Sequence, residues 1–376
     1  KRLIARRYEN MKLVLGVLAG TIVPVLSCLL LTSSGTSAAW SRLFLSSTGS
    51  YWPSVALYII VFIVFLQLVE TPFIFYSGFI VDHRFGLSTQ RLKDWIVDQF
   101  KSVGLDMALG ILVGLVLYYL LGATNLWWLA AAALFALFSV LLSIVLPYLI
   151  MPIFYKVTPI TDLELKDKLL EMVKKVGAKR IDRVLVADES RRSVRANAMF
   201  SGIGRAKAII LFDTLIKKFT SREILTVVAH ELGHYVNKDI WKSALVSGLM
   251  AIPPFFIADY ALRNGTLVLG FSGITDPAGL PMIFAVLIAV GFLLQPVSNG
   301  ISRRFEFQAD EFALRAAEDS DAQASAEKRL ADMNLSVDNP NRFVEFIFYT
   351  HPSSSKRVKL AEDWKKEHSP KSVNTT

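Results

Sequence analysis

One stretch of this sequence, residues 230–310, predicts how the chain folds. It begins with His230-Glu231-Leu232-Gly233-His234, continues through two apolar segments, Ala244–Leu262 and Met282–Val297, and ends with Arg304-Phe305-Glu306-Phe307-Gln308-Ala309-Asp310. If the first apolar segment crosses a membrane and the second returns, the polar stretches that flank them lie at the same membrane face. We therefore expect side chains 72 positions apart (306 − 234) to meet.

The spacing of the polar side chains indicates a metal site. His230 and His234 project from nearly the same side of a helix, because one turn takes about 3.6 residues. Two imidazoles at this spacing can bind one zinc ion, and Glu231 can act as general base on a water molecule that the zinc holds. Glu306 offers a third ligand, and Asp310, one turn further on, would accept a hydrogen bond from a ligand imidazole and fix its tautomer. The alternative, that both histidines are ordinary surface residues, does not explain why Glu306 and Asp310 follow one helical turn apart.

The composition predicts a multi-pass membrane protein. Of the 376 residues, 53% are hydrophobic and only 19% are charged, and the mean hydropathy is +0.44. A membrane-spanning helix needs about 20 apolar residues. Six segments approach or exceed this length, and we expect each to cross the membrane: Leu13–Leu31, Val55–Ile80, Met107–Leu121, Leu126–Phe154, Ala244–Leu262 and Met282–Val297.

The net charge of +9 fits a membrane protein better than a nucleic-acid-binding one. Lys and Arg gather before the first span, in the loop after the second, and in residues 156–242, whereas the loop between spans one and two holds only Arg42. This alternation places both termini and the zinc motif in the cytosol. We expect no nucleic-acid partner, because no aromatic-basic platform or recognition motif is present. The lone Cys28 excludes an internal disulfide.

These features predict an all-α polytopic membrane protein of six, or at most seven, transmembrane helices, with a small α+β zinc-metallopeptidase domain on the cytosolic side. The expected division is a membrane block with spans one to four (1–154), a soluble segment with an edge strand and the histidine helix (155–243), spans five and six (244–299), and C-terminal catalytic helices with the third ligand and a tail (300–376).

Local patterns refine the soluble segment. We expect an amphipathic helix over Leu163–Val176 and strands over Arg183–Ala187 and Ala206–Phe212. Thr220 followed three residues later by Glu223 predicts a capping box at the start of the histidine helix. Glu306 is expected to open a further helix after span six.

Two further segments offer substrate contacts. A donor such as His351 or Arg357 near the zinc would stabilise the oxyanion of a tetrahedral intermediate, although the spacing alone fits an ordinary loop histidine equally. Asn197, in Arg195-Ala196-Asn197-Ala198, could hold a peptide that adds as a strand to a sheet edge, but an isolated asparagine is also typical of a turn.

Three acidic side chains lie within or at the ends of spans, where charge usually faces a protein interior or a wet cavity. We expect Glu70, Asp106 and Asp259 to line a chamber. For Asp106, a position at the membrane interface fits the sequence equally well.

The combination of these motifs resembles a known family, the integral-membrane type I CAAX prenyl proteases, which are zinc metalloendopeptidases. The resemblance covers most of the chain after the first span. The matching stretches are Phe85-Gly86-Leu87-Ser88 with Trp95 and Asp98, Pro147, Met151 through Pro159, Asn197-Ala198 with Gly202, Asp213-Thr214-Leu215, His230 to His234, Glu306 to Asp310, and His351-Pro352 with Arg357.

The resemblance implies a barrel of tilted helices around a large water-filled chamber, with one zinc ion per chain at its cytosolic end. It also implies removal of the last three residues from prenylated Cys-aliphatic-aliphatic-X C-termini, with a second, upstream cut in some members. The family's zinc ligands fall on His230, His234 and Glu306, and its catalytic base falls on Glu231. Its remaining functional residues fall on Asn197 with Ala198, His351 and Arg357.

The chain departs from the family pattern in its number of spans, since eukaryotic members have seven. Its short loops fit a prokaryotic member, whose natural substrate would differ because prokaryotes do not generally prenylate proteins for such an enzyme. We expect a monomer in the endoplasmic reticulum membrane of a eukaryote or in the plasma (inner) membrane of a prokaryote.

Two alternatives remain at this point. A quality-control zinc protease of the heat-shock type shares the zinc motif and the later glutamate, but it usually has fewer spans and lacks the context of Gln308-Ala309-Asp310 and His351-Pro352. A catalytically silent scaffold would be expected to have lost Glu231 or a ligand, and none is lost here.

Overall fold

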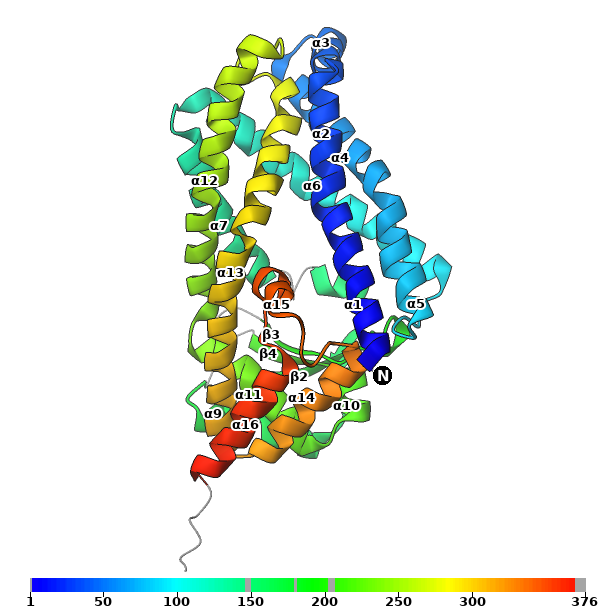
Figure 1. Ribbon diagram of the computed structural model, residues 1–376, viewed down its shortest axis with the longest axis vertical. Helices are drawn as coiled ribbons and strands as arrows, with labels where there is room; N and C mark the ends of the chain where they lie inside the picture. The colour runs from blue at the N-terminus through cyan, green and yellow to red at the C-terminus, as the bar shows by residue number, and fades with distance from the viewer. Residues whose placement is uncertain (1, 146–149, 179–180, 202–206, 369–376) are drawn as a thin grey trace, which may run out of the picture.

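Long helices form one layer of the molecule, and a small α+β layer lies at one end of them (Figure 1). The computed structural model describes residues 2–145, 150–178, 181–201 and 207–368. The helices of the long layer are α1 (Arg2–Val17), α2 (Val23–Ser33), α3 (Thr36–Thr48), α4 (Tyr51–Phe75), α5 (Asp82–Arg84), α6 (Leu92–Ala123), α7 (Trp127–Val145), α12 (Asp239–Val268) and α13 (Leu280–Ala317). Short π-helical segments, Leu18–Ile22 and Tyr76–Val81, continue α1 into α2 and α4 into α5.

Five helical segments among the described residues are long and apolar enough to span a membrane: Arg2–Ser33, Tyr51–Arg84, Leu92–Ala123, Asp239–Thr266 and Pro277–Ala317. They correspond to five of the six expected spans, and the protein is a multi-pass membrane protein. Of the remaining one, Leu126–Phe154, the structure describes a shorter apolar helix over Trp127–Ser143 and a separate turn, α8 (Met151–Phe154). Residues 146–149 lie outside the described residues.

An apolar core among the described residues joins the spans. It includes Tyr58 of α4, Tyr118 of α6, Trp127 of α7, Leu262 of α12 and Ile283 of α13, all less than 2% exposed. Residues 244–299 thus share this core with residues 1–154.

A cavity of about 650 Å³ opens between α4, α6, α7, α12 and α13, and its lining is mainly apolar. Gln67, Glu70 and Asp106 contribute its polar atoms, and Nε2 of Gln67 donates to Oδ2 of Asp106 over 3.0 Å. Asp259, expected to line the same space, instead accepts a 2.6 Å hydrogen bond from Nε1 of Trp127 and pairs with Arg263 at 2.8 Å. Its charge is therefore compensated within the helix packing.

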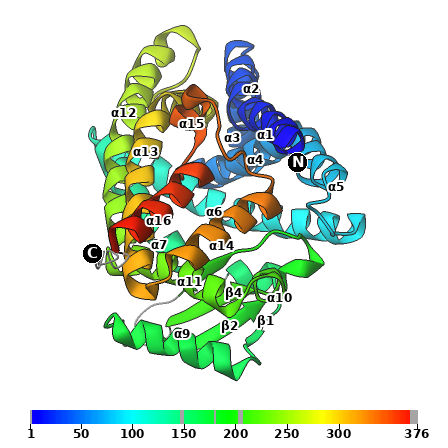
Figure 2. The same cartoon turned by 60° about the horizontal axis from the view of Figure 1, so that its bottom comes forward.

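The α+β layer holds a four-stranded sheet in the order β1-β2-β4-β3 (Figure 2). The central pair β2 and β4 is parallel, whereas β1 and β3 pair antiparallel at the two edges. The strands are β1 (Val157–Pro159), β2 (Ile181–Ala187), β3 (Ala198–Ser201) and β4 (Lys207–Phe212). The predicted strands correspond to β2 and β4. The sequence predicted an edge strand within residues 155–243 but not the bounds of β1 and β3, because three or four residues show too little periodicity.

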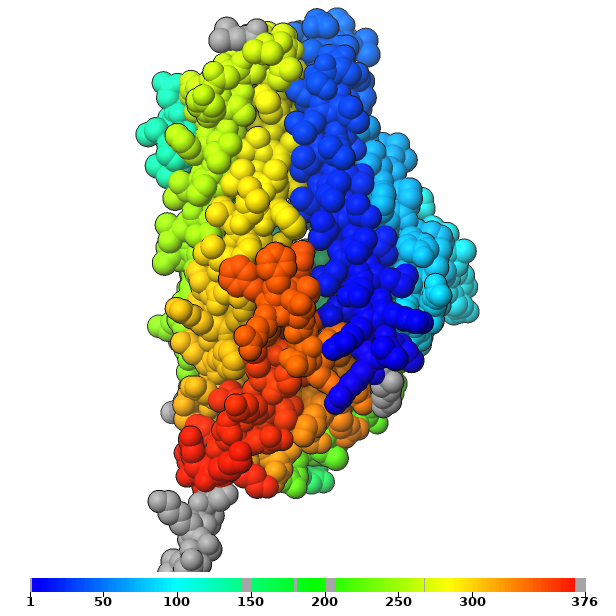
Figure 3. Space-filling view, in the orientation of Figure 1, coloured from blue at the N-terminus to red at the C-terminus, as the bar shows by residue number. Residues whose placement is uncertain are grey.

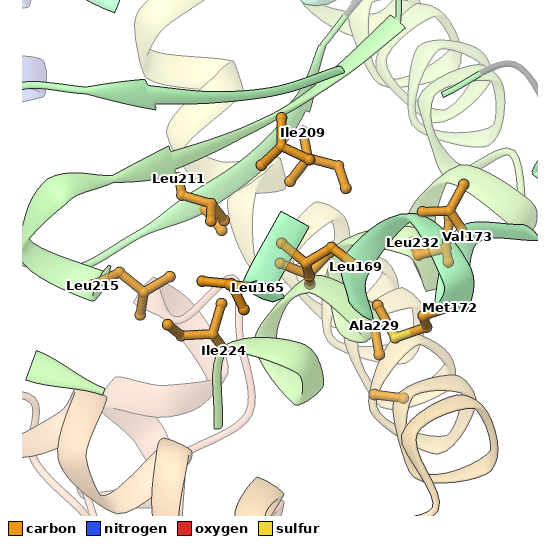
Figure 4. Packing of buried hydrophobic residues seen from close by; sticks show 14 of the residues in the cluster. Leu165, Leu169, Met172, Val173, Ile209, Leu211, Leu215, Ile224, Ala229 and Leu232 are labelled. Carbon is orange, nitrogen blue, oxygen red and sulfur yellow. The ribbon is translucent and has the colours of Figure 1, made fainter. Parts of the chain in front are cut away.

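Helices cover this sheet and complete its core. They are α9 (Leu163–Lys175), α10 (Asp213–Lys218) and α11 (Ser221–Val236), and α14 (Ser320–Asn334) packs on α11. Two further C-terminal helices are α15 (Arg342–Phe348), which packs on α13, and α16 (Ser354–His368), which packs on α14. Short 3-10 turns lie at Glu189–Arg191 and, next to α3, at Pro277–Gly279. Leu169 of α9, Leu211 of β4 and Leu232 of α11 meet in one apolar cluster, each fully buried (Figure 4). The predicted amphipathic helix, α9, therefore fixes the sheet against the histidine helix.

The expectation that Glu306 opens a new helix is wrong, because α13 runs without a break from Leu280 to Ala317. The helix continues through Pro296 and Gly300 into the segment that carries Glu306. At 1.5 Å per residue, its 38 residues extend for about 57 Å. One rigid element therefore carries both the last span and the expected third ligand.

Close packing of α12 on α7 depends on Gly248. A Cβ atom at this position would lie 2.8 Å from Cβ of Ala136. We expect Gly248→Ala to force the two helices apart and to lower the free energy of unfolding by about 1–3 kcal/mol, measured by thermal or denaturant unfolding in detergent. Gly291→Ala on α13 is the matched control, since no atom lies within 4 Å of its Cβ position. Equal stability of the two variants would contradict this account.

Candidate metal centre

The metal centre forms where α11 packs against α13. Thr220 and Glu223 form the predicted capping box, with both reciprocal hydrogen bonds present, and so fix the start of α11. Gly233 then allows close approach, because a Cβ there would lie 2.9 Å from Cα of Ala309. This contact places the turn that carries His230 and His234 directly beside the corresponding turn of α13.

Three side chains converge at this contact: His230, His234 and Glu306. The two Nε2 atoms are 3.2 Å apart, and the oxygens of Glu306 lie 3.2 Å from Nε2 of His230 and 3.5 Å from Nε2 of His234. In a tetrahedral shell with bonds of about 2.0–2.1 Å, ligand atoms are separated by about 3.3 Å. The three groups thus have the mutual spacing of ligands around one metal ion.

An unsatisfied oxygen supports the same interpretation. Oε2 of Glu306 is buried and has no hydrogen-bond partner among the described residues, although Nε2 of His230 lies 3.2 Å away. A buried carboxylate oxygen without a partner is costly. A cation between the three groups would satisfy it, so these residues fit a bound metal.

Carboxylates hold both imidazoles from the other side. Oδ1 of Asp310 lies 2.7 Å from Nδ1 of His230, as the sequence predicted. Oδ2 of Asp239 lies 2.9 Å from Nδ1 of His234. Each imidazole ring therefore directs its Nε2 atom toward the point where the two histidines and Glu306 converge.

Arg357 lies in a different environment from the one expected. Its Nε and Nη2 donate to the two oxygens of Asp310 at 2.7 and 2.5 Å, and its Nη1 lies 2.8 Å from Oε2 of Glu327. Burial alone would lower the pKa of Arg357, but the carboxylates of Glu327 and Asp310 raise it. These contacts favour a role in holding Asp310 over the expected role as an oxyanion donor.

His351 reaches the centre from a third direction. The helix before it, α15, lies between α13 and α1 (Figure 3), where Nδ2 of Asn299 donates to the carbonyl of Ile347 over 2.5 Å. Nε2 of His351 then lies 3.3 Å from Oε1 of Glu306, and its side chain is 59% exposed. His351 is therefore at the solvent-facing side of the cluster, where a substrate could reach it.

Asn197 lies at the sheet edge. It directly precedes β3, its Oδ1 accepts from the amide of Ala198 over 2.9 Å, and its carbonyl accepts from the amide of Phe212 over 3.0 Å. The edge strand β3 also packs against α11. Among the described residues, β3 pairs with β4 only, so its outer edge lies unpaired next to the histidine helix.

The electrostatics of the cluster suit a cation. Burial and Arg357 lower the pKa of His230, but Asp310 and Glu306 outweigh them and raise it to about 10. Burial also lowers the pKa of His234, and its hydrogen bond with Glu306 raises it above the usual value. At neutral pH, a metal ion must therefore displace a proton from His230 in order to bind. At Glu231, burial raises the pKa of the carboxyl group.

Sequence reasoning missed Asp239 and Glu327. Asp239 follows His234 by five residues, which on an unbroken helix would place it about 140° around the helix axis from His234. The break between α11 and α12 is what brings the two side chains together. Glu327 belongs to α14, and no local pattern distinguishes it from the other charged residues of that helix.

A multi-pass membrane protein whose HExxH helix meets a carboxylate at the end of a span belongs to the class of membrane metallopeptidases. Residues 159–365 match the description "Peptidase family M48", and residues 4–156 match "CAAX prenyl protease N-terminal, five membrane helices". The chain belongs to peptidase family M48.

Individual relatives agree with this assignment. A probable CAAX prenyl protease 1 of Schizosaccharomyces pombe is 30% identical over 77% of this chain and 61% of its own length. An uncharacterized metalloprotease of Bacillus subtilis is 30% identical over 78% of this chain and 69% of its own length. The crystal structure of S. mikatae Ste24p superposes with a TM-score of 0.83 at 25% identity, covering 95% of this chain and 88% of that one.

The raised pKa of His230 predicts competition between protons and metal. Because the pKa is about 10 in the metal-free site, binding must displace a proton at neutral pH. We expect the metal dissociation constant to rise about tenfold for each pH unit lowered from 9 to 7, measured by chelator competition with the pH dependence of the chelator subtracted. A pH-independent constant over this range would contradict the protonation that we infer.

Loss of Arg357 should be costly. Arg357→Met leaves Asp310 and Glu327 buried without their shared cation, and breaking such a buried pair costs about 3–5 kcal/mol of unfolding free energy. The control is Arg222→Met, since Arg222 pairs with Asp319 at 2.6 Å with a side chain that is 72% exposed, and exposed pairs contribute little to stability. Comparable losses in the two variants, by thermal unfolding, would disprove the buried-pair interpretation.

Proposed function

We propose that the chain is a membrane-embedded zinc endopeptidase that hydrolyses a peptide bond near the C-terminus of CAAX-type, prenylated proteins or peptides. The observation that carries the proposal is the convergence of His230, His234 and Glu306 at tetrahedral spacing. Two histidines and a glutamate are a donor set that zinc takes in catalytic sites with an open position. The names of relatives, CAAX prenyl protease 1 among them, support the substrate class.

The residues divide the catalytic work. When bound, zinc would polarise the scissile carbonyl and make water a better acid. Glu231, between the two ligands, takes the proton of the attacking water and delivers it to the leaving amine. Burial raises the pKa of its carboxyl group, which makes the carboxylate a stronger base. Asp310 and Arg357 keep the first imidazole in the orientation that binding needs.

The substrate lies along the free edge of β3. A peptide that adds antiparallel to β3 would pair with the backbone at Ala198, and Asn197 at the start of the strand would hold the peptide backbone. His351, at the exposed side of Glu306, would donate to the oxyanion of the tetrahedral intermediate. These three residues are thus the proposed substrate contacts.

We infer that the zinc site faces the cytosol, because the basic segments alternate along the chain in the way that keeps Lys and Arg on that side. The membrane would be the endoplasmic reticulum in a eukaryote and the inner membrane in a prokaryote, and the chain would act as a monomer. The lipid bilayer and a peptide or protein substrate are its expected partners.

Removal of the general base tests the mechanism. We expect Glu231→Gln to lower kcat on a farnesylated CAAX peptide by about 10²–10⁴-fold while zinc still binds, because the carboxylate is not a ligand. His230→Ala should lose zinc as well as activity. Glu171→Gln, on the exposed face of α9, is the control and should match wild type.

The products identify the substrate class. Mass spectrometry should show loss of three residues from the farnesylated peptide, and comparison with an unprenylated peptide reports whether the lipid is required. Cleavage of unfolded membrane proteins but not of the peptide would instead indicate a quality-control protease. Absence of zinc-dependent cleavage in both assays would refute the proposed function.

A further inference from the structure

Asp239 is a buried carboxylate with both oxygens engaged. Its Oδ2 lies 2.9 Å from Nδ1 of His234, and its Oδ1 accepts from Nζ of Lys242 over 3.0 Å. The residue is 5% exposed. The ammonium group of Lys242 therefore balances the charge of the carboxylate on one side, and the imidazole of His234 contacts the carboxylate on the other side.

A local distortion of the backbone creates this contact. Lys238 adopts the left-handed conformation, with φ 57° and ψ 37°, between the end of α11 and the start of α12. A non-glycine residue rarely adopts this region, and it persists there where the surrounding structure holds it. Without the break, Asp239 would point about 140° away from His234. The left-handed turn at Lys238 thus brings Asp239, the first residue of α12, into contact with His234.

The contact has a counterpart on the other arm of the membrane hairpin. Oδ1 of Asp310, on α13, lies 2.7 Å from Nδ1 of His230. Lys242 also links the arms, since its Nζ lies 5.4 Å from the ring centre of Phe305, the neighbour of Glu306. The two histidines are therefore held by two carboxylates from two different membrane helices.

We propose that Asp239 is a positioning residue for His234, so that each arm of the membrane hairpin, α12 and α13, holds one ligand imidazole. A carboxylate at Nδ1 fixes the tautomer in which Nε2 is free to bind metal, and it makes the ring a stronger donor. The proposal rests on the zinc centre of the proposed function. It makes the geometry of that centre depend on where span five begins.

A purely structural role for Asp239 makes a different prediction. An acidic residue in the first turn of a helix also stabilises that helix through the helix dipole. Loss of this effect would change the stability of the chain and leave the zinc dissociation constant unchanged. The zinc affinity therefore separates the two roles.

The experiment measures zinc binding to the purified full chain in detergent by chelator competition. Asp239→Asn keeps the size and one acceptor oxygen but loses the charge, whereas Asp239→Ala loses the contact. We expect the zinc dissociation constant to rise about tenfold in the first variant and up to about 100-fold in the second. The absorption spectrum of bound cobalt(II) should also change in Asp239→Ala, because His234 is no longer held in one orientation.

Asp259→Asn is the matched control. Asp259 lies on the same helix, but it is hydrogen-bonded to Trp127 and Arg263 and not to a metal ligand. The zinc affinity of the Asp259→Asn variant should therefore equal that of wild type. Circular dichroism confirms folding, and if Asp239→Ala does not fold, Asp239→Asn decides. Folded Asp239 variants that bind zinc as tightly as wild type would overturn the positioning role of Asp239 but would leave the proposed zinc centre intact. Wild type that binds zinc no better than His234→Ala would overturn the zinc centre, and with it the proposed function.

Discussion

The close contact between α11 and α13 is the constraint on which the site depends. Gly233 can face Ala309 because it has no Cβ, and a methyl group would come within 2.9 Å of the backbone of α13. At this separation, Glu306 can reach both histidines of α11. A wider contact would leave two histidines and a glutamate that could not share one ion. The glycine within the motif thus has a packing role that is separate from the chemistry of its neighbours.

The concentration of charge behind His230 follows from this contact. Two helices that pack so closely bury Asp310 completely, and a buried carboxylate must be compensated. The imidazole compensates it on one side and Arg357 on the other, and Glu327 in turn faces Arg357. The chain of alternating charges runs from α11 through α13 and α16 to α14. The C-terminal helices therefore stabilise the centre although they supply none of its three ligands.

Membrane helices and peptidase domain form a single structural unit around the centre. The long helix α13 passes from the apolar core, at Ile283, to the third ligand without interruption. On the other arm, α12 begins beside His234 and continues into the same core. Displacement of either span would move a group that contacts the cluster. This arrangement differs from a soluble domain tethered to a membrane, in which the anchor and the site can move independently.

The sequence by itself determined the local features of this protein. The spacing of His230 and His234 follows from helix periodicity, the capping box from Thr220 and Glu223, and most of the spans from the lengths of apolar segments, because each depends on residues within a few turns. Tertiary structure decided the rest. Glu306 lies within α13 because that helix continues through Pro296 and Gly300. Arg357 is buried between carboxylates of other helices, and Asp239 meets His234 through one left-handed residue. These outcomes depend on packing between distant segments and on a single backbone angle, which periodicity and composition do not encode.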